Sequence, residues 1–153
     1  METRALGGVR VIDLSQLEAG PVCTLTPAQM GAEVIKIERS KYGEQSRMGA
    51  RSLHGTQGPG ADTIHFALLN PNKKSATLNL KAEKGREILR GLIKIGTVVK
   101  VKLHVLVSPP HMSDSPFEIA PSPTLGQHTD EVYMRLLSMT EAEISALREE
   151  GVT

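Results

Sequence analysis

The sequence contains one cysteine, no tryptophan, two tyrosines and two phenylalanines. The single cysteine, Cys23, excludes an internal disulfide and leaves no cysteine cluster for a metal ion. Few aromatic side chains argue against the base-stacking surfaces that bind single-stranded nucleic acid. The hydrophobic core must therefore be built from aliphatic side chains, and Cys23 is expected to be a small core residue.

The sequence also lacks a long apolar run and an excess of charge of either sign. Its 18 Lys and Arg residues nearly balance 17 acidic residues, giving a formal net charge of +1. This balance gives no argument for nucleic acid or an anionic membrane as a partner. No apolar stretch approaches the ~18 residues of a membrane span, and the first residues lack a secretory-signal pattern. We therefore expect a cytoplasmic protein without a membrane or nucleic-acid partner.

No histidine stands at metal-ligand spacing from a cysteine, an aspartate or another histidine. A metal site is therefore not predicted. With 153 residues, the chain is long enough for one domain with a buried core.

The first forty residues have the pattern of a strand, a helix and a second strand. Residues 9–14 and 33–38 are short runs rich in β-branched side chains, which is typical of buried strands. Residues 22–30 favour a helix, although Pro27 requires it either to begin near Thr26 or to be kinked. This order predicts a parallel pair of strands joined by a right-handed crossover, the start of an α/β sheet.

The remaining periodic segments predict two more strands and three more helices. Alternating side chains predict strands over residues 75–80 and 97–107. Apolar residues at helical spacing predict helices over 82–94, 130–137 and 141–149. Thr140 and Glu143 form a capping-box pattern at the start of the last helix, and Gly151 follows its end.

Two long segments have no periodicity. Residues 40–62 contain five glycines and predict a long surface loop. Residues 108–123 contain five prolines, which exclude regular structure and indicate a linker or a surface arm.

Three short polar motifs follow or precede the predicted strands. Residues 13–21 end the first strand and lead into a helix, which suits either a ligand phosphate or a plain turn. Glu38 and Arg39 end the second strand, where they form either a nucleotide contact or a solvated pair. Residues 70–75 place amides and ammonium groups on one turn, either for an adenine and a phosphate or simply exposed to water.

Together these motifs resemble the family III CoA-transferases, which include formyl-CoA and carnitine-CoA transferases and α-methylacyl-CoA racemases. The resemblance begins with Gly8–Leu14, Ala19–Pro21 and Gly31–Arg39 and continues, in order, through 66–75, 78–81 and 85–89. Residues 120–132 resemble the C-terminal signature of the family, and residues 144–152 resemble its last helix. The resemblance implies an α/β fold: a Rossmann-like parallel sheet with flanking helices, incomplete relative to the family, with a Pro-rich arm and C-terminal helices.

The family implies coenzyme A or an acyl-CoA as the substrate, no covalently bound cofactor and a possible homodimer. By motif position, the CoA contacts would be Glu18, Ala19, Arg39, Asn70, Pro71, Asn72 and Lys73. Glu18 departs from the apolar residue or Gln that the family often has there, and a carboxylate is unfavourable beside an anionic ligand.

The family's nucleophilic aspartate has no counterpart at a matching motif. Family members transfer CoA from an acyl-CoA to a carboxylic acid, through a carboxylate that attacks the thioester and holds the acyl group. The aspartates of this chain are Asp13, Asp62, Asp114 and Asp130, and none stands in that motif. The catalytic residue is therefore unassigned.

The sequence reads as two ends of the family sequence joined without its centre. We expect a single truncated CoA-binding domain over 1–153, with an N-terminal family segment at 1–93 and a C-terminal one at 94–153. The join itself lies within 93–101. Three hypotheses follow: a shortened CoA-transferase homologue, a non-catalytic CoA-binding or subunit-interaction module, and a remnant of an internal deletion without function.

Overall fold

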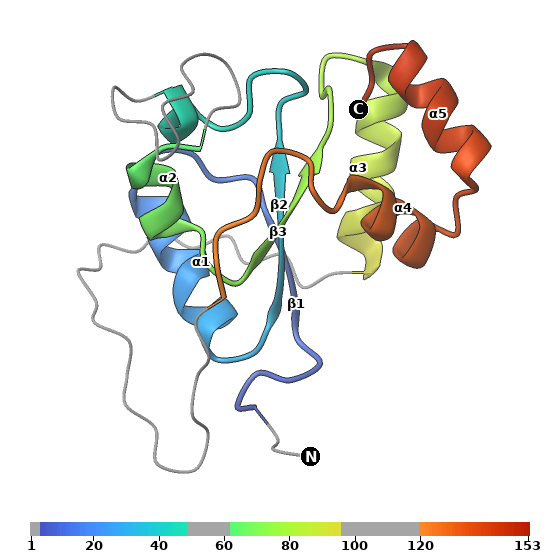
Figure 1. The fold of residues 1–153 in the computed structure, drawn as a ribbon. Helices are drawn as coiled ribbons and strands as arrows, with labels where there is room; N and C mark the ends of the chain where they lie inside the picture. Colours follow the sequence, from blue (N-terminus) through green and yellow to red (C-terminus); the bar gives the residue numbers. More distant parts are fainter. Residues whose placement is uncertain (1–3, 49–61, 96–119) are drawn as a thin grey trace.

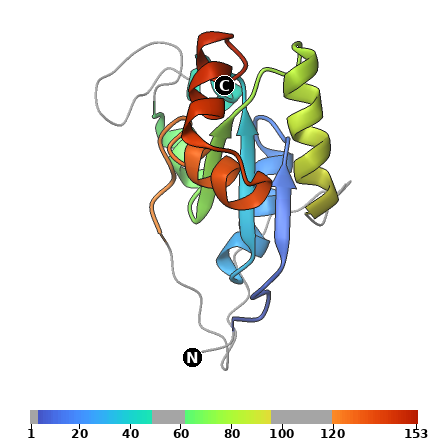
Figure 2. The same cartoon turned by 90° about the vertical axis from the view of Figure 1, so that its right-hand side faces the viewer.

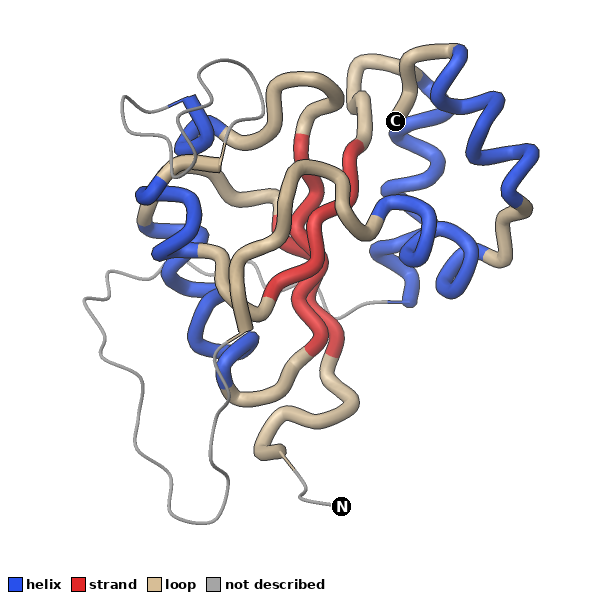
Figure 3. The backbone as a smooth tube through the Cα atoms, viewed as in Figure 1, coloured by secondary structure: helices blue, strands red, loops and turns tan. Residues whose placement is uncertain are grey.

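A small parallel sheet lies between two layers of helices (Figure 1). The computed structural model describes residues 4–48, 62–95 and 120–153. The sheet consists of β1 (Arg10–Asp13), β2 (Glu33–Glu38) and β3 (Lys73–Thr77), in the order β1-β2-β3. Both neighbouring pairs are parallel. Figure 3 shows the strands in red, with helices on either side of them. The predicted α/β class with a parallel sheet and flanking helices is thus confirmed.

The helices divide between the two faces of the sheet. One face, on the left of the sheet in Figure 1, carries α1 (Ala19–Gln29), α2 (Ile64–Leu69) and the short 3-10 helix η1 (Gln45–Met48). The opposite face is covered by three helices, seen in front of the strands in Figure 2. These are α3 (Glu83–Ile95), α4 (Thr129–Leu137) and α5 (Glu141–Glu149).

Helix α1 begins earlier than the sequence predicted and continues through Pro27. The expected start near Thr26 is wrong, because the helix already begins at Ala19. Pro21 lies in its first turn, where a residue without an N–H loses no intrahelical hydrogen bond. After Pro27, the Met30 amide still donates to the Thr26 carbonyl at 3.0 Å.

Strand β3 is displaced toward the N-terminus relative to the predicted strand over 75–80. Pairing with β2 begins at Val34 opposite Lys73 and ends at Glu38 opposite Thr77. The register with β2 therefore decides where β3 begins and ends. The alternation of polar and apolar side chains continues to residue 80, but residues 78–80 have no register partner in β2.

The predicted surface loop over 40–62 is wrong in its first part. Glu44, Ser46 and Arg47 are buried, and η1 forms around the last two. The short apolar segment after this loop forms α2, whose N-cap Thr63 accepts a hydrogen bond from the Phe66 amide at 3.0 Å. The predicted strand over 97–107 and most of the predicted arm over 108–123 lie outside the described residues.

The C-terminal part of the chain binds along the outer edge of β3. The His128 amide donates to the Ser75 carbonyl at 2.9 Å, and the Thr77 amide donates to Thr129 Oγ1 at 3.0 Å. Further along, the Asn72 amide donates to the Ala120 carbonyl at 3.2 Å. Residues 120–129 thus occupy the backbone groups of β3 that β2 leaves open.

Both terminal parts of the chain contribute to one hydrophobic core. Its buried residues come from the three strands, from α3 and from the C-terminal helices: Ile12, Ile35, Ile37, Ala76, Leu78, Leu92, Val132, Tyr133, Ile144, Leu147 and Val152. A smaller cluster beneath α1 contains Val11, Ala28, Ala32 and Val34. The predicted capping box of α5 is confirmed by both of its hydrogen bonds. Within the described ranges, none of the helices is both long and apolar enough to cross a membrane.

Candidate functional site

The sheet face beneath α1 and α2 changes from apolar to charged along the strands. In the middle strand Val34, Lys36 and Glu38 point to this face, and Asp13 lies beside Lys36 in the register. Six ionisable side chains are buried here, with three of each sign: Asp13, Glu38, Glu44, Lys36, Lys73 and Arg47. Buried charges are tolerated only when they are paired and hydrogen-bonded, so this cluster must be held in one arrangement.

Asp13 ends β1 and anchors the loop that leads into α1. Its Oδ1 accepts hydrogen bonds from the Ser15 amide at 2.8 Å and from the Ser15 hydroxyl. Its Oδ2 accepts from Thr24 Oγ1 at 2.7 Å and from Lys73 Nζ at 3.3 Å. Burial opposes ionisation of this carboxyl, but Lys36, Lys73 and the two hydroxyls outweigh burial and lower the pKa of Asp13.

Lys36 connects the same loop to the segment after β2. Its ammonium donates to the Ser15 carbonyl at 3.0 Å and lies 3.7 Å from Asp13 Oδ2. It also forms an ion pair with Glu44 Oε2 at 3.1 Å. This pair lacks hydrogen-bond geometry, so Glu44 Oε2 has no hydrogen-bond partner among the described residues. The loop after β1 and the loop after β2 are thus fixed to each other.

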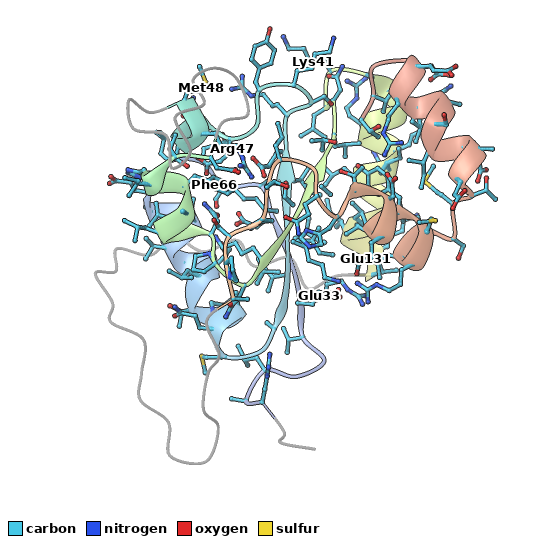
Figure 4. The ribbon with its side chains drawn as sticks, viewed as in Figure 1. Glu33, Lys41, Arg47, Met48, Phe66 and Glu131 are labelled. Carbon is cyan, nitrogen blue, oxygen red and sulfur yellow. The ribbon has the colours of Figure 1, made fainter. Side chains whose placement is uncertain are left out.

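Arg47 binds the end of β2 and is fully buried. Its Nε donates to Glu38 Oε2 at 2.7 Å and its Nη2 to Glu38 Oε1 at 2.9 Å, a two-point pairing of guanidinium and carboxylate. A third donor reaches Asp62, and the Phe66 ring centroid lies 3.5 Å from the guanidinium carbon. Figure 4 shows Arg47 beside Phe66 of α2. Arg47 therefore joins β2, η1 and α2.

Lys73 and Asn70 lie inside the molecule. Lys73 Nζ donates to the Pro21 carbonyl at 2.8 Å and to Asn70 Oδ1 at 2.9 Å, in addition to Asp13. Burial lowers the pKa of the Lys73 ammonium to about 7, although the neighbouring Asp13 carboxylate acts in the opposite direction. The reading of residues 70–75 as an exposed polar turn is wrong for these two residues. Their role as CoA contacts remains a prediction.

The other predicted contacts are distributed between the surface and the interior. Glu18 and Ala19 are exposed at the start of α1, and Arg39 is exposed just after β2. Pro71 is buried and Asn72 is half-buried, at the other end of the sheet where β3 begins. The structure therefore brings Lys73 to the first turn of α1, while Pro71 and Asn72 stay at the opposite end of the strands.

The start of α1 offers free backbone donors. The amides of Ala19 and Gly20 have no hydrogen-bond partner within the described residues, and the Glu18 side chain does not cap the helix. Such amides, together with the helix dipole, favour a bound anion. A Cβ at Gly20 would overlap the Ser15 side chain, so glycine is required for the loop to pack against this helix end.

The pairing of Glu38 with Arg39 as a nucleotide contact is only half consistent with the geometry. Glu38 is buried and bound to Arg47 and to the Ser75 hydroxyl at 2.6 Å, so it faces inward. Arg39, in contrast, has no hydrogen bond or ion pair from its side chain to any residue that the structure describes. Arg39 is therefore the group at this strand end that remains available to a ligand.

The aspartates that the structure describes all have structural partners. Asp13 is buried among four donors, Asp62 binds Arg47 at 2.5 Å, and Asp130 pairs with Arg148 between α4 and α5. Asp114 lies outside the described residues. A carboxylate that attacks a thioester needs a free and accessible oxygen, and Asp13, with both oxygens bonded, does not supply one.

Sequence reasoning missed Lys36, Glu44 and Arg47. The strand signal for residues 33–38 was strong, but periodicity could not show that its charged side chains are buried. Glu44 and Arg47 lie in a stretch without periodicity. Their only signal was composition: one acidic and one basic residue shortly after a strand that itself carries Lys36 and Glu38.

Comparison with known proteins gives consistent matches. The family model described as CoA-transferase family III matches residues 6–101. A formyl-CoA:oxalate CoA-transferase from Rhodopseudomonas palustris strain BisA53 is 44% identical over 92 residues, which are 60% of this chain and 20% of that protein. A protein of the same name from Afipia carboxidovorans is 43% identical over 91 residues, again 60% of this chain and 20% of that protein. The chain thus spans about a fifth of the length of these relatives.

Two solved structures have a similar fold. A hypothetical protein from Mycobacterium tuberculosis matches with a TM-score of 0.53 and 30% identity, over 63% of this chain and 24% of that one. A CAIB/BAIF family protein from Brucella suis matches with a TM-score of 0.52 and 30% identity, over 60% of this chain and 24% of that one.

Proposed function

Because the chain belongs to CoA-transferase family III, we propose that it binds the CoA part of an acyl-CoA at the carboxyl ends of β1 and β2. In this proposal the amides at the start of α1 and the guanidinium of Arg39 hold the phosphates of CoA. The chain acts in the cytoplasm and takes CoA as a substrate rather than as a covalent cofactor.

The observation that carries the proposal is the placement of free donors at two neighbouring strand ends. The amides of Ala19 and Gly20 follow β1. Arg39, whose side chain is unpaired among the residues that the structure describes, follows β2, the direct neighbour of β1 in the sheet. In open parallel sheets, ligands bind in the crevice beyond the carboxyl ends of the strands. Arginine and helix N-termini are both suited to phosphate oxygens.

Glu18 limits where the negatively charged part of the ligand binds. Its carboxylate is exposed and lies 3.7 Å from His65 Nε2. Like charges at close range repel, so the Glu18 carboxylate opposes phosphates bound at the neighbouring amides, and the positive charge of Arg39 is needed to offset it.

For the family reaction, we propose that this chain alone has little or no transferase activity. The reaction needs an accessible nucleophilic carboxylate, and the aspartates that the structure describes are engaged in structural pairs. Binding without turnover is the function that these residues support best.

Isothermal titration of the full chain with CoA tests the binding proposal. We expect Arg39→Ala to weaken CoA binding about tenfold, the typical effect of one charge-assisted contact to phosphate. Lys94→Ala is the matched control, because Lys94 is exposed at the far end of α3 and should leave the affinity unchanged. Equal affinity for CoA in wild type and Arg39→Ala would contradict the site.

A transferase assay tests the catalytic part separately. The relatives are named formyl-CoA:oxalate CoA-transferases, so formyl-CoA with oxalate is the first donor and acceptor pair to use, followed by other acyl-CoA donors. Clear turnover by the purified chain would overturn the proposal of binding without transfer, and would show that another carboxylate performs the attack.

A second candidate function is subunit interaction, including a homodimer. Five large apolar side chains are exposed on the loop after β1, on η1 and on α2: Leu14, Leu17, Met48, Ile64 and Leu68. Exposed apolar groups that gather on one side of a protein favour contact with another surface. Light scattering across a concentration series tests this. A monomer at all concentrations would contradict homodimer formation.

A further inference from the structure

The turn after β2 has an unusual backbone for its sequence. The Gly43 amide donates to the Arg39 carbonyl at 2.9 Å, which closes the turn. Lys41 has φ of 68° and Gly43 has φ of 69°, both in the left-handed region. Glycine adopts this region freely, but for lysine it costs about 1 kcal/mol. Residues held in such sparsely populated conformations cluster at active sites, ligand-binding sites and switch regions.

The buried ion pair beneath the turn holds it in place. A Cβ at Gly43 would lie 2.6 Å from Arg47 Cδ and 3.0 Å from Glu38 Oε2, so only glycine fits over this pair. The Glu44 amide then donates to Glu38 Oε2 at 2.9 Å. Both ends of the turn are therefore fixed to β2 and Arg47, which leaves its side chains preorganised.

The turn projects two cations and one aromatic ring into solvent. Arg39 and Lys41 are exposed, and 51% of Tyr42 is accessible. Figure 4 shows Lys41 at the outer end of the molecule, beyond the carboxyl ends of the strands. Neither cation is paired with an acidic side chain in the part of the chain that the structure describes. The turn thus combines uncompensated positive charge with an exposed π-surface.

From this geometry we infer that Lys41 and Tyr42 bind the adenosine 3′-phosphate end of CoA. Lys41 contacts the 3′-phosphate and Tyr42 stacks on the adenine, because aromatic side chains stack on bases and ammonium groups bind phosphate. Arg39 lies at the strand end, nearer the amides of α1, and faces the diphosphate. This inference rests on the proposed CoA binding and adds two contacts to it.

Titrations with CoA and with 3′-dephospho-CoA, using the full chain, test the two assignments. Lys41→Gly should weaken CoA binding about fivefold to tenfold and leave 3′-dephospho-CoA binding unchanged. This substitution also removes the left-handed strain, so loss of affinity cannot be attributed to unfolding. Tyr42→Ala should weaken both ligands about fivefold to tenfold, whereas Tyr42→Phe should retain both affinities.

The outcomes separate this inference from the proposed function. If wild type binds CoA and both Lys41→Gly and Tyr42→Ala bind it equally well, the inference is overturned while CoA binding stands. If wild type fails to bind CoA, the proposed function and the inference fail together. Lys94→Ala again serves as the control for a general loss of positive charge.

Discussion

The Lys73 ammonium lies 3.3 Å from the Asp13 carboxylate, across 60 residues of sequence, and neither side chain is accessible to solvent. This pair ties the end of β1 to the start of β3. It also reaches α1, because Lys73 donates to the Pro21 carbonyl. The loop that presents the free amides of α1 therefore depends on an interaction buried beneath it.

Lys73→Met should destabilise the chain by about 3–5 kcal/mol, because it leaves a buried carboxylate without one of its two cations. Urea unfolding followed by circular dichroism measures the change. Lys74→Met is the matched control: its side chain is 28% exposed, and its ammonium pairs with Glu33 and Glu131, which are labelled in Figure 4. That control should cost less than about 1 kcal/mol. Similar small losses in both variants would contradict a desolvated Lys73–Asp13 pair.

His128 should make stability depend on pH below neutrality. Its Nδ1 accepts a hydrogen bond from the Ser75 amide at 3.2 Å, which requires the neutral ring. Burial lowers the pKa of His128, with Lys74 acting in the same direction and Glu131 against it. The unfolded chain then binds the proton more readily, so stability is full above the ordinary pKa of 6.5 and decreases as pH falls below it.

The matched variant for this test is His128→Asn, whose Oδ1 takes the place of Nδ1 as an acceptor and does not titrate. Between pH 7 and pH 5, the unfolding free energy of wild type should fall by about 0.5 kcal/mol more than that of the variant. This is the lower end of the range for one hydrogen bond, as expected at a half-exposed site. Unfolding free energies from urea curves at several pH values give this difference. Parallel pH curves for the two proteins would rule the prediction out.

Two glycines in α3 should respond to alanine in opposite ways. A Cβ at Gly85 would overlap the carbonyl oxygen of Asn79, which belongs to the backbone and cannot move aside easily. Gly85→Ala should therefore destabilise the chain by about 1–3 kcal/mol, as overpacking does. A Cβ at Gly91 would lie 3.1 Å from a methyl group of Leu137, which is flexible. Gly91→Ala should be neutral or stabilising by up to about 1 kcal/mol, because alanine favours the helix. Thermal unfolding compares the two, and equal losses would contradict the Asn79 contact.

Pro27→Ala should stabilise the protein by about 1–3 kcal/mol. Proline within a helix lacks the donor for one backbone hydrogen bond and crowds the preceding turn. Pro27 lies inside α1, whereas Pro21 lies in the first turn, so Pro21→Ala is the control with little expected gain. Melting temperatures measure both changes. An unchanged or lower melting temperature for Pro27→Ala would indicate that the proline ring packs favourably enough to offset its cost.

The sequence predicted those elements whose limits are set locally. Residues 33–38 form a strand because β-branched side chains dominate it, and α5 begins at its capping box because Thr140 and Glu143 satisfy its first amides. Strand β3 was misplaced because its limits depend on the register with β2. The alternation of polar and apolar side chains within β3 does not show which residues of β2 it pairs with.

The candidate site was predicted less completely than the fold. The motif after β1 and Arg39 lie at the expected strand ends, but the burial of Lys73 depends on Asp13, Pro21 and Asn70, which are distant from one another in the sequence. A lysine in a polar turn is normally solvated. Only the folded chain shows that three acceptors converge on the Lys73 ammonium.

Residues 120–129 close the edge of the sheet that β3 forms. At the outer edge of β3 the backbone groups of Ser75 and Thr77 are already occupied. An exposed strand edge is a template for uncontrolled joining of chains into fibres and precipitates. By closing this edge, the C-terminal part protects a shortened sheet from aggregation, so a version of the chain that lacks residues 120–153 should be prone to it.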